Sequence, residues 1–200
     1  MPTERLRGPR RVGVLALQGD FREHLAALRA TEVEGVPVRL ATDLENVDAL
    51  ILPGGESTTM ARLMEPALRD SIQRRVAAGM PVMGTCAGMI LMARDVQDGR
   101  VDQEPLQLMD IGVRRNAYGR QIDSFEAEVE SQAIGGAGPA VFIRAPQLIE
   151  HGDSVEELAR HGDQVVAVRQ GNRLALAFHP ELTPDRRWHQ YFLTFHGEKR

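Results

Sequence analysis

The only cysteine of the chain lies between two glycines, in the sequence Gly84-Thr85-Cys86-Ala87-Gly88. Residues 81–83 before it are typical of a short apolar strand, and residues 89–93 after it are typical of the start of a buried helix. A G-x-C-x-G turn between strand and helix has the geometry of a nucleophile elbow, and the helix N-terminus behind it favours a thiolate. A buried structural cysteine is the alternative interpretation. The flanking glycines favour the prediction that Cys86 is a nucleophile.

A nucleophilic thiol needs a base nearby and a group that orients the base. Of the six histidines, only His179 follows an apolar strand, in the sequence Phe178-His179-Pro180-Glu181. Active sites of open α/β sheets gather at the C-terminal ends of strands, so His179 and the elbow are expected on one edge. In extended backbone, residues two apart point the same way, which lets Glu181 reach the ring. The sequence therefore predicts a triad in which Cys86 attacks, His179 transfers protons and Glu181 orients the imidazole.

A glycine-rich loop, Pro53-Gly54-Gly55-Glu56-Ser57, follows another apolar strand. Its glycines permit close approach of the backbone to a ligand. The amides of Gly55 and Ala87 could together form an oxyanion hole, in which one donor is typically worth ~2.7–4 kcal/mol of transition-state stabilisation. A plain loop whose Ser57 or Thr58 caps a helix is a second interpretation, and it is compatible with the first.

The elements that must position these residues alternate between strand and helix in the first half of the chain. That alternation predicts a parallel sheet covered by helices on both faces. The predicted strands there are 12–17, 36–40, 47–52 and 81–83. Asp20 is expected to cap a helix whose apolar positions include Leu25 and Leu28, and further helices begin at Ser57 or Thr58 and span 66–79. The second half predicts strands at 108–113, 125–129, 140–143 and 155–158, a hairpin of 165–168 with 174–178, and a helix over 185–196. The expected architecture is α/β, with three layers and a mostly parallel central sheet.

The composition narrows the class of protein. The chain has 200 residues, of which 42% are hydrophobic, and the net charge of −4 with 4% aromatic residues argues against a nucleic-acid binder. No apolar run approaches the ~20 residues of a membrane span. One cysteine cannot form an intramolecular disulfide or a cysteine zinc cluster, and it suits a reducing cytoplasm. We expect an Arg-rich, poorly ordered tail over residues 1–10 and a single domain over residues 11–200.

These motifs give the chain a family resemblance. The elbow and the His-Pro-Glu sequence resemble those of class I, or triad, glutamine amidotransferases, which have a flavodoxin-like fold. The Gly-Glu-Ser-Thr-Thr and Arg-Asn-x-Tyr-Gly-Arg-Gln segments are similar to those of the glutaminase subunits of pyridoxal 5′-phosphate synthase. The matching segments span nearly the whole chain outside the tail: residues 15–19, 52–60, 84–90, 115–121, 123–126, 141–146 and 179–183.

The resemblance implies that Cys86 attacks the side-chain amide of L-glutamine, that ammonia leaves, and that the γ-glutamyl thioester is hydrolysed to glutamate. The family's substrate contacts correspond to Gly55, Glu56, Ser57, Arg115, Ile143 and Arg144. A cation such as Arg115 suits the substrate carboxylate, and an acceptor such as Glu56 suits its ammonium group. Ile143 has an apolar side chain, so a specific contact there must come from its backbone.

The resemblance also implies a partner, a (β/α)₈-barrel synthase subunit that takes up the ammonia, in a large hetero-oligomer whose formation raises the glutaminase activity. It implies no cofactor, no metal, no nucleic acid and no membrane. Three alternatives stay open on the sequence: a glutaminase subunit that serves a histidine, purine or pyrimidine pathway, a cysteine peptidase or deglycase-like protein, and a silent binding module on the same fold.

Overall fold

The computed structural model describes residues 11–98, 104–115 and 124–195. The predicted tail at 1–10, residues 116–121 and 123 of the family-like segments, and the last residue of the predicted final helix, His196, lie outside the described residues.

A nine-stranded mixed sheet forms the centre of the protein, in the order β2-β1-β3-β4-β12-β11-β10-β7-β8. The parallel half consists of β2 (Glu34–Val38), β1 (Arg11–Leu15), β3 (Ala49–Leu52), β4 (Val82–Thr85) and β12 (Arg173–Leu176). The other half continues antiparallel through β11 (Gln164–Gln170), β10 (Glu156–His161), β7 (Ser124–Ser131) and β8 (Gly136–Ile143). The α/β sheet predicted from the alternation is confirmed, and its parallel half is the part that carries the motifs.

The parallel strands form where the sequence is continuously apolar. All four residues of β3 and of β4 are buried, as expected for strands covered on both faces. Pro37 lies in β2, which is an edge strand as predicted. A proline has no backbone N–H to donate to a neighbouring strand, so it is tolerated where the strand has only one neighbour.

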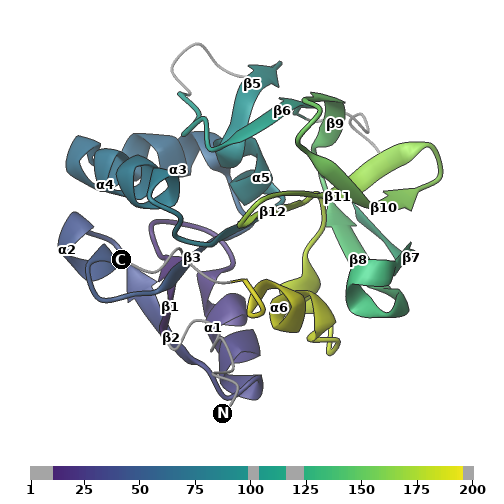
Figure 1. Cartoon of the computed structure of the whole chain (residues 1–200), viewed down its shortest axis with the longest axis horizontal. Helices are drawn as coiled ribbons and strands as arrows, with labels where there is room; N and C mark the ends of the chain where they lie inside the picture. The colour runs from purple at the N-terminus through teal and green to yellow at the C-terminus, as the bar shows by residue number, and fades with distance from the viewer. Residues whose placement is uncertain (1–10, 99–103, 116–123, 196–200) are drawn as a thin grey trace, which may run out of the picture.

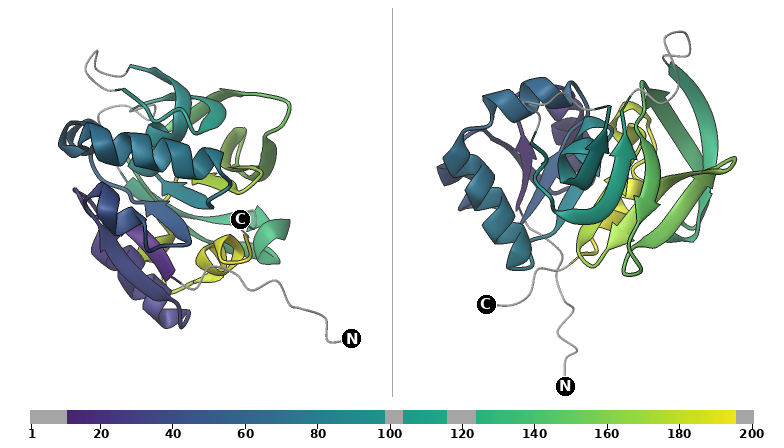
Figure 2. Two further views of the ribbon diagram at one scale, coloured as in Figure 1. Left: turned by 60° about the vertical axis from the view of Figure 1, so that its left-hand side comes forward. Right: turned by 90° about the horizontal axis from the view of Figure 1, so that it is seen from above.

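Helices cover both faces of the parallel half. Figure 1 shows α3 (Ser57–Leu63) and α4 (Pro66–Ala77) on one side, and α1 (Phe21–Ala30) and α6 (Arg187–Phe192) on the other. The short helices α2 (Ala41–Leu44) and α5 (Ala87–Met92) contact α4 and the strands β3 and β4, respectively. Figure 2 shows β7, β8 and β10 on the far side of the molecule from α3 and α4. None of the helices in the described part of the chain is long and apolar enough to cross a membrane.

A second, three-stranded sheet differs from the sequence prediction. It consists of β5 (Ala93–Gln97), β6 (Met109–Arg114) and β9 (Gln147–His151), of which only β6 was expected. The helix after Cys86 ends at Met92, and Ala93 already pairs with β6. Two 3₁₀ turns, η1 (Gln132–Ile134) and η2 (Pro180–Leu182), complete the structure. The final helix is shorter than the predicted 185–196, but its Trp188 and Phe192 are buried in the core as expected for packing residues.

Candidate active site

The predicted catalytic residues lie where neighbouring parallel strands end. Cys86 directly follows β4, His179 comes three residues after β12, and the Gly54-Gly55 loop follows β3. Asp20 lies in the connection from β1 to α1. Because β1, β3, β4 and β12 are adjacent and parallel, all four connections emerge on one edge of the sheet.

Cys86 has the strained backbone of a nucleophile elbow. Its φ is +48° and its ψ is −104°, a conformation that costs a non-glycine residue on the order of 1–3 kcal/mol. The backbone is held by a hydrogen bond from the Cys86 amide to the Leu176 carbonyl at 2.8 Å. A Cβ atom at Gly88 would clash with the carbonyl oxygen of Leu52, so only glycine allows α5 to lie this close to β3.

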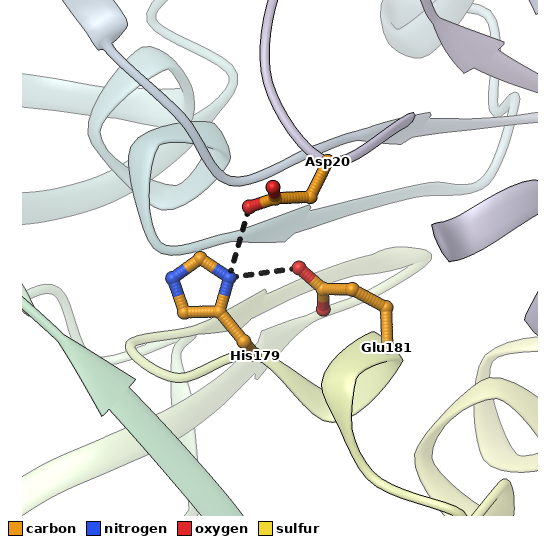
Figure 3. Close-up of side chains that lie close together, drawn as sticks. All are labelled: Asp20, His179 and Glu181. Carbon is orange, nitrogen blue, oxygen red and sulfur yellow. Dashed lines mark hydrogen bonds and ion pairs between the residues drawn. The ribbon is translucent and has the colours of Figure 1, made fainter. Parts of the chain in front are cut away.

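His179 and Glu181 form the hydrogen bond predicted for them. Nδ1 of His179 lies 2.8 Å from Oε1 of Glu181 (Figure 3), and both side chains are buried. Extended backbone was expected here, whereas Pro180 and Glu181 lie in the 3₁₀ turn η2. The proline thus starts a tight turn that brings the carboxylate beside the ring, and the contact is as expected although the backbone premise was wrong.

The imidazole of His179 is held in its charged form. Burial alone lowers its pKa, but the interactions with the side chains of Asp20, Cys86 and Glu181 outweigh burial and raise the pKa of His179 to about 12. The thiol of Cys86 donates to the carbonyl oxygen of Ile143 at 3.6 Å. Nε2, the ring nitrogen that points away from the carboxylates in Figure 3, makes no hydrogen bond of ordinary length within the described residues.

Asp20 was expected to cap a helix, but its side chain lies beside the proposed catalytic residues. Its Oδ2 lies 3.4 Å from Nδ1 of His179 (Figure 3), and its amide donates to the Gly54 carbonyl at 3.0 Å. Asp20 does occupy the N-cap position of α1, but its side chain makes no capping hydrogen bond. The predicted capping role is therefore wrong, because the carboxylate turns toward the imidazole.

Three ligand atoms in this cluster lie close enough together for a metal ion. One atom each from Asp20, His179 and Glu181 lies within 4.8 Å of the others. The bond between His179 and Glu181, however, already occupies Nδ1 with a proton. We therefore interpret the cluster as a hydrogen-bonded acid–base group.

Glu56 and Arg115 contact each other. Arg115 Nη2 lies 3.2 Å from Glu56 Oε1, and the same carboxylate accepts from the amides of Thr58 at 3.1 Å and Thr59 at 2.7 Å. Burial raises the pKa of Glu56, but hydrogen bonds from Thr59 and Thr58 outweigh it and lower the pKa to about 2. Glu56 is therefore the cap of α3, and not Ser57 or Thr58 as the sequence suggested.

The remaining predicted residues lie on the same edge. Gly55, with φ +141°, precedes Glu56, whose amide donates to Gln18 Oε1 at 2.7 Å. Ala87 is the first residue of α5, next to Cys86. Ile143 ends β8, and its carbonyl oxygen accepts from the Cys86 thiol. Further positions are Ser57, the buried first residue of α3, and Arg144, an exposed residue with φ +42°.

Sequence reasoning missed a second group behind the predicted triad. His24 of α1 is fully buried and contacts Thr85 Oγ1 at 3.1 Å and His189 Nε2 at 3.0 Å. Nε2 of His24 also lies 3.4 Å from Oε2 of Glu181. A signal existed, since His24 lies next to the predicted apolar face of Leu25 and Leu28, but nothing in the sequence pairs it with residues far along the chain.

Comparisons with known proteins agree with this geometry. A curated relative named pyridoxal 5′-phosphate synthase subunit PdxT, from Acidothermus cellulolyticus, is 56% identical over 191 residues, 92% of each chain. A relative of the same name from Frankia casuarinae is 56% identical over 93% of this chain and 94% of its own.

Two solved structures are also similar. A crystal structure of a glutamine amidotransferase is 49% identical with a TM-score of 0.87, covering 92% of this chain and 97% of its own. PurLQS from Thermotoga maritima shares only the fold, at 16% identity and a TM-score of 0.70 over 94% of this chain and 98% of its own. The model of the SNO glutamine amidotransferase family matches residues 14–196. The chain therefore belongs to the SNO glutamine amidotransferase family.

Proposed function

We propose that this protein hydrolyses L-glutamine to L-glutamate and ammonia, as the glutaminase subunit of a pyridoxal 5′-phosphate synthase. The observation that carries the proposal is the strained Cys86 elbow on the same edge as the hydrogen-bonded pair of His179 and Glu181. The names of relatives that are more than half identical over nine-tenths of the chain support the same activity and pathway.

In this mechanism the proton of Cys86 Sγ already lies on Nε2 of His179, in the charged form of the ring that its neighbours favour, when the sulfur bonds to the amide carbon of glutamine. The amides of Gly55 and Ala87 stabilise the oxyanion that forms on the former carbonyl oxygen. The charged imidazole then gives its proton to the leaving nitrogen, the C–N bond breaks, and ammonia departs. Because hydrogen bonds with its neighbours raise the pKa of His179, the ring holds this proton until the leaving group takes it.

The second half of the reaction removes the γ-glutamyl group. A water molecule gives a proton to His179 as its oxygen attacks the thioester carbon. The carbon–sulfur bond then breaks, Sγ recovers the proton, and glutamate is released. Glu181 keeps Nδ1 protonated throughout, so that Nε2 is the nitrogen that exchanges protons.

Glutamine binding requires a change in the pairing of Glu56 with Arg115. In our proposal Arg115 turns to the substrate carboxylate and Glu56 accepts from the substrate ammonium, while Ser57 borders the same pocket. In the proposed glutamine pocket, Ile143 contacts the substrate through its backbone, and Arg144 provides a nearby positive charge. The ion pair thus holds both groups in place before the substrate arrives.

The ammonia needs an acceptor close by, since most free ammonia is protonated in neutral water. We propose that a (β/α)₈-barrel synthase subunit docks on this catalytic edge, in a hetero-oligomer, and takes the ammonia through its interior. Residues 11–200 would then act as one glutaminase domain in the cytoplasm, with no cofactor of its own.

The test is glutamate release from L-glutamine, measured with and without the synthase subunit. The proposal expects turnover that rises when this synthase is added and does not rise with the synthase of a histidine or purine pathway. Stimulation by one of those other synthases would contradict the assigned pathway and leave the glutaminase chemistry standing.

A further inference from the structure

A chain of buried side chains extends behind the proposed triad. Oε2 of Glu181, the oxygen that does not bind His179, lies 3.4 Å from Nε2 of His24. The same Nε2 lies 3.1 Å from the hydroxyl of Thr85, the residue before Cys86. Nδ1 of His24 lies 3.0 Å from Nε2 of His189 on α6. His24, Thr85 and His189 are all fully buried.

Both of these histidines are neutral. Burial and the neighbouring His189 lower the pKa of His24 well below its usual value. Burial and the charge of Arg186 lower the pKa of His189 to about 4. A neutral imidazole carries one proton on one of its two nitrogens, so each ring offers one donor and one acceptor.

The surroundings decide which nitrogen carries the proton. Oε2 of Glu181 is a buried carboxylate oxygen that has no hydrogen-bond partner among the described residues. A proton on Nε2 of His24 is donated to Thr85 Oγ1 at 3.1 Å and also places positive charge 3.4 Å from Oε2, whereas a lone pair on Nε2 would be repelled by the carboxylate. Nδ1 of His24 must then accept from Nε2 of His189. With its proton on Nε2, His189 has a lone pair on Nδ1, the nitrogen that has no partner in the described structure. A buried N–H without an acceptor at this position would cost more free energy than the lone pair does.

We propose that His24 is a positioning residue for the glutaminase reaction, one that holds Glu181 through its Nε2–H while His189 fixes its tautomer. The proposal rests on the proposed function. Glu181 then has an imidazole at both oxygens: His179 forms a hydrogen bond at Oε1, and the polarised Nε2–H of His24 attracts Oε2 from 3.4 Å. Since His24 also contacts Thr85, one imidazole links the orienting carboxylate to the strand end that carries Cys86.

A matched pair of amide variants tests the proposal. The amide nitrogen of glutamine can occupy the place of Nε2, whereas the shorter asparagine reaches only the place of Nδ1. We expect His24→Asn to lower kcat by about tenfold to 100-fold, the range for a partner that orients a catalytic ligand. The KM for glutamine should stay within about twofold of wild type, because His24 touches none of the proposed substrate contacts. His24→Gln should recover most of the kcat.

A control separates positioning from folding. Leu28 is fully buried on the same helix and touches the apolar core, so Leu28→Ala should lower the melting temperature and leave the kcat of the folded protein unchanged. All variants are assayed with the synthase present. Equal kcat in His24→Asn and wild type, or equal losses in the Asn and Gln variants, would overturn the positioning role.

A measurement without turnover separates this inference from the proposed function. Nitrogen NMR of protein labelled in histidine should find both His24 and His189 neutral and protonated on Nε2 at pH 7. A proton on Nδ1 of His24, or a charged ring, would overturn the inference whatever the activity. Correct tautomers in a wild-type protein that releases no glutamate would instead sink the glutaminase assignment.

Discussion

Oδ2 of Asp20 lies 3.4 Å from Nδ1 of His179, the same ring atom that donates to Glu181 at 2.8 Å. Two carboxylates from opposite ends of the chain therefore share one imidazole proton. Burial lowers the pKa of His179, and the contact with Asp20 is the largest single interaction that raises it, so Asp20→Asn should lower that pKa. The imidazole titration, followed by NMR in both proteins, measures the change.

The sign of the stability effect follows from the same pKa. A raised folded-state pKa gives stability that is fully present below the unfolded value near 6.5 and is lost as the pH rises toward the folded value of about 12. Asp20→Asn should therefore destabilise the protein more at pH 6 than at pH 10. Glu181 keeps the ring oriented in the variant, so kcat should fall by less than about tenfold. An unchanged His179 titration would show that Asp20 does not act on the ring.

Gly54 makes room for the imidazole. A Cβ atom at this position would overlap the ring of His179. Gly54→Ala should therefore displace the ring and reduce kcat by about 100-fold or more, since a shift of ~1 Å at a catalytic group can cost that much. Gly171→Ala is the matched control, because Gly171 has φ +58° and nothing within 4 Å of an added Cβ. The control should lose about 1–2 kcal/mol of stability and keep its kcat; loss of activity in both variants would contradict the argument.

Arg115 and its neighbour Arg114 form a natural comparison. Arg115 pairs with Glu56, whereas the exposed Arg114 binds Gln97 on the surface. Arg115→Ala should raise the KM for glutamine by about tenfold to 100-fold, the value of one or two charge-assisted hydrogen bonds. Arg114→Ala should leave the KM within about twofold. Steady-state kinetics of the two variants measure the two KM values. Equal KM values would show that Arg115 does not bind the substrate.

Glu56 should make the fold sensitive to acid. Its pKa, lowered to about 2 by the hydrogen bonds from Thr59 and Thr58, gives stability that is present above pH 4.5 and is lost as the pH falls through 2. Glu56→Gln removes this contribution, so its melting temperature should lie below that of wild type at pH 6 and approach it at pH 2–3. Thermal unfolding across this pH range measures the difference. A difference that does not vary with pH would show that the carboxylate charge is not what caps α3.

The proposed triad could be predicted because each part has a local signal. Gly84 and Gly88 mark the elbow, and Pro180 joins His179 to Glu181 within one turn. The alternation of apolar strands and helices then predicts that both segments end on one edge of a parallel sheet. Such signals need only a few neighbouring residues, which is why these expectations agree with the structure.

The other features depend on contacts that the local sequence does not encode. β5 is a strand because Ala93 pairs with Met109, and β9 because Gln147 pairs with Arg114. The carboxylate of Asp20 contacts the imidazole of His179, which is far along the chain, and does not cap α1. Glu56 replaced Ser57 and Thr58 as the cap of α3, since a longer side chain can reach two amides and Arg115 together.

The most direct test of the central claim compares glutamate release by wild type and by Cys86→Ala, with the synthase subunit present. If Cys86 forms the thioester, the variant should lose activity to the level of the uncatalysed reaction while its melting temperature stays near that of wild type. A variant that still releases glutamate at a comparable rate would contradict the mechanism.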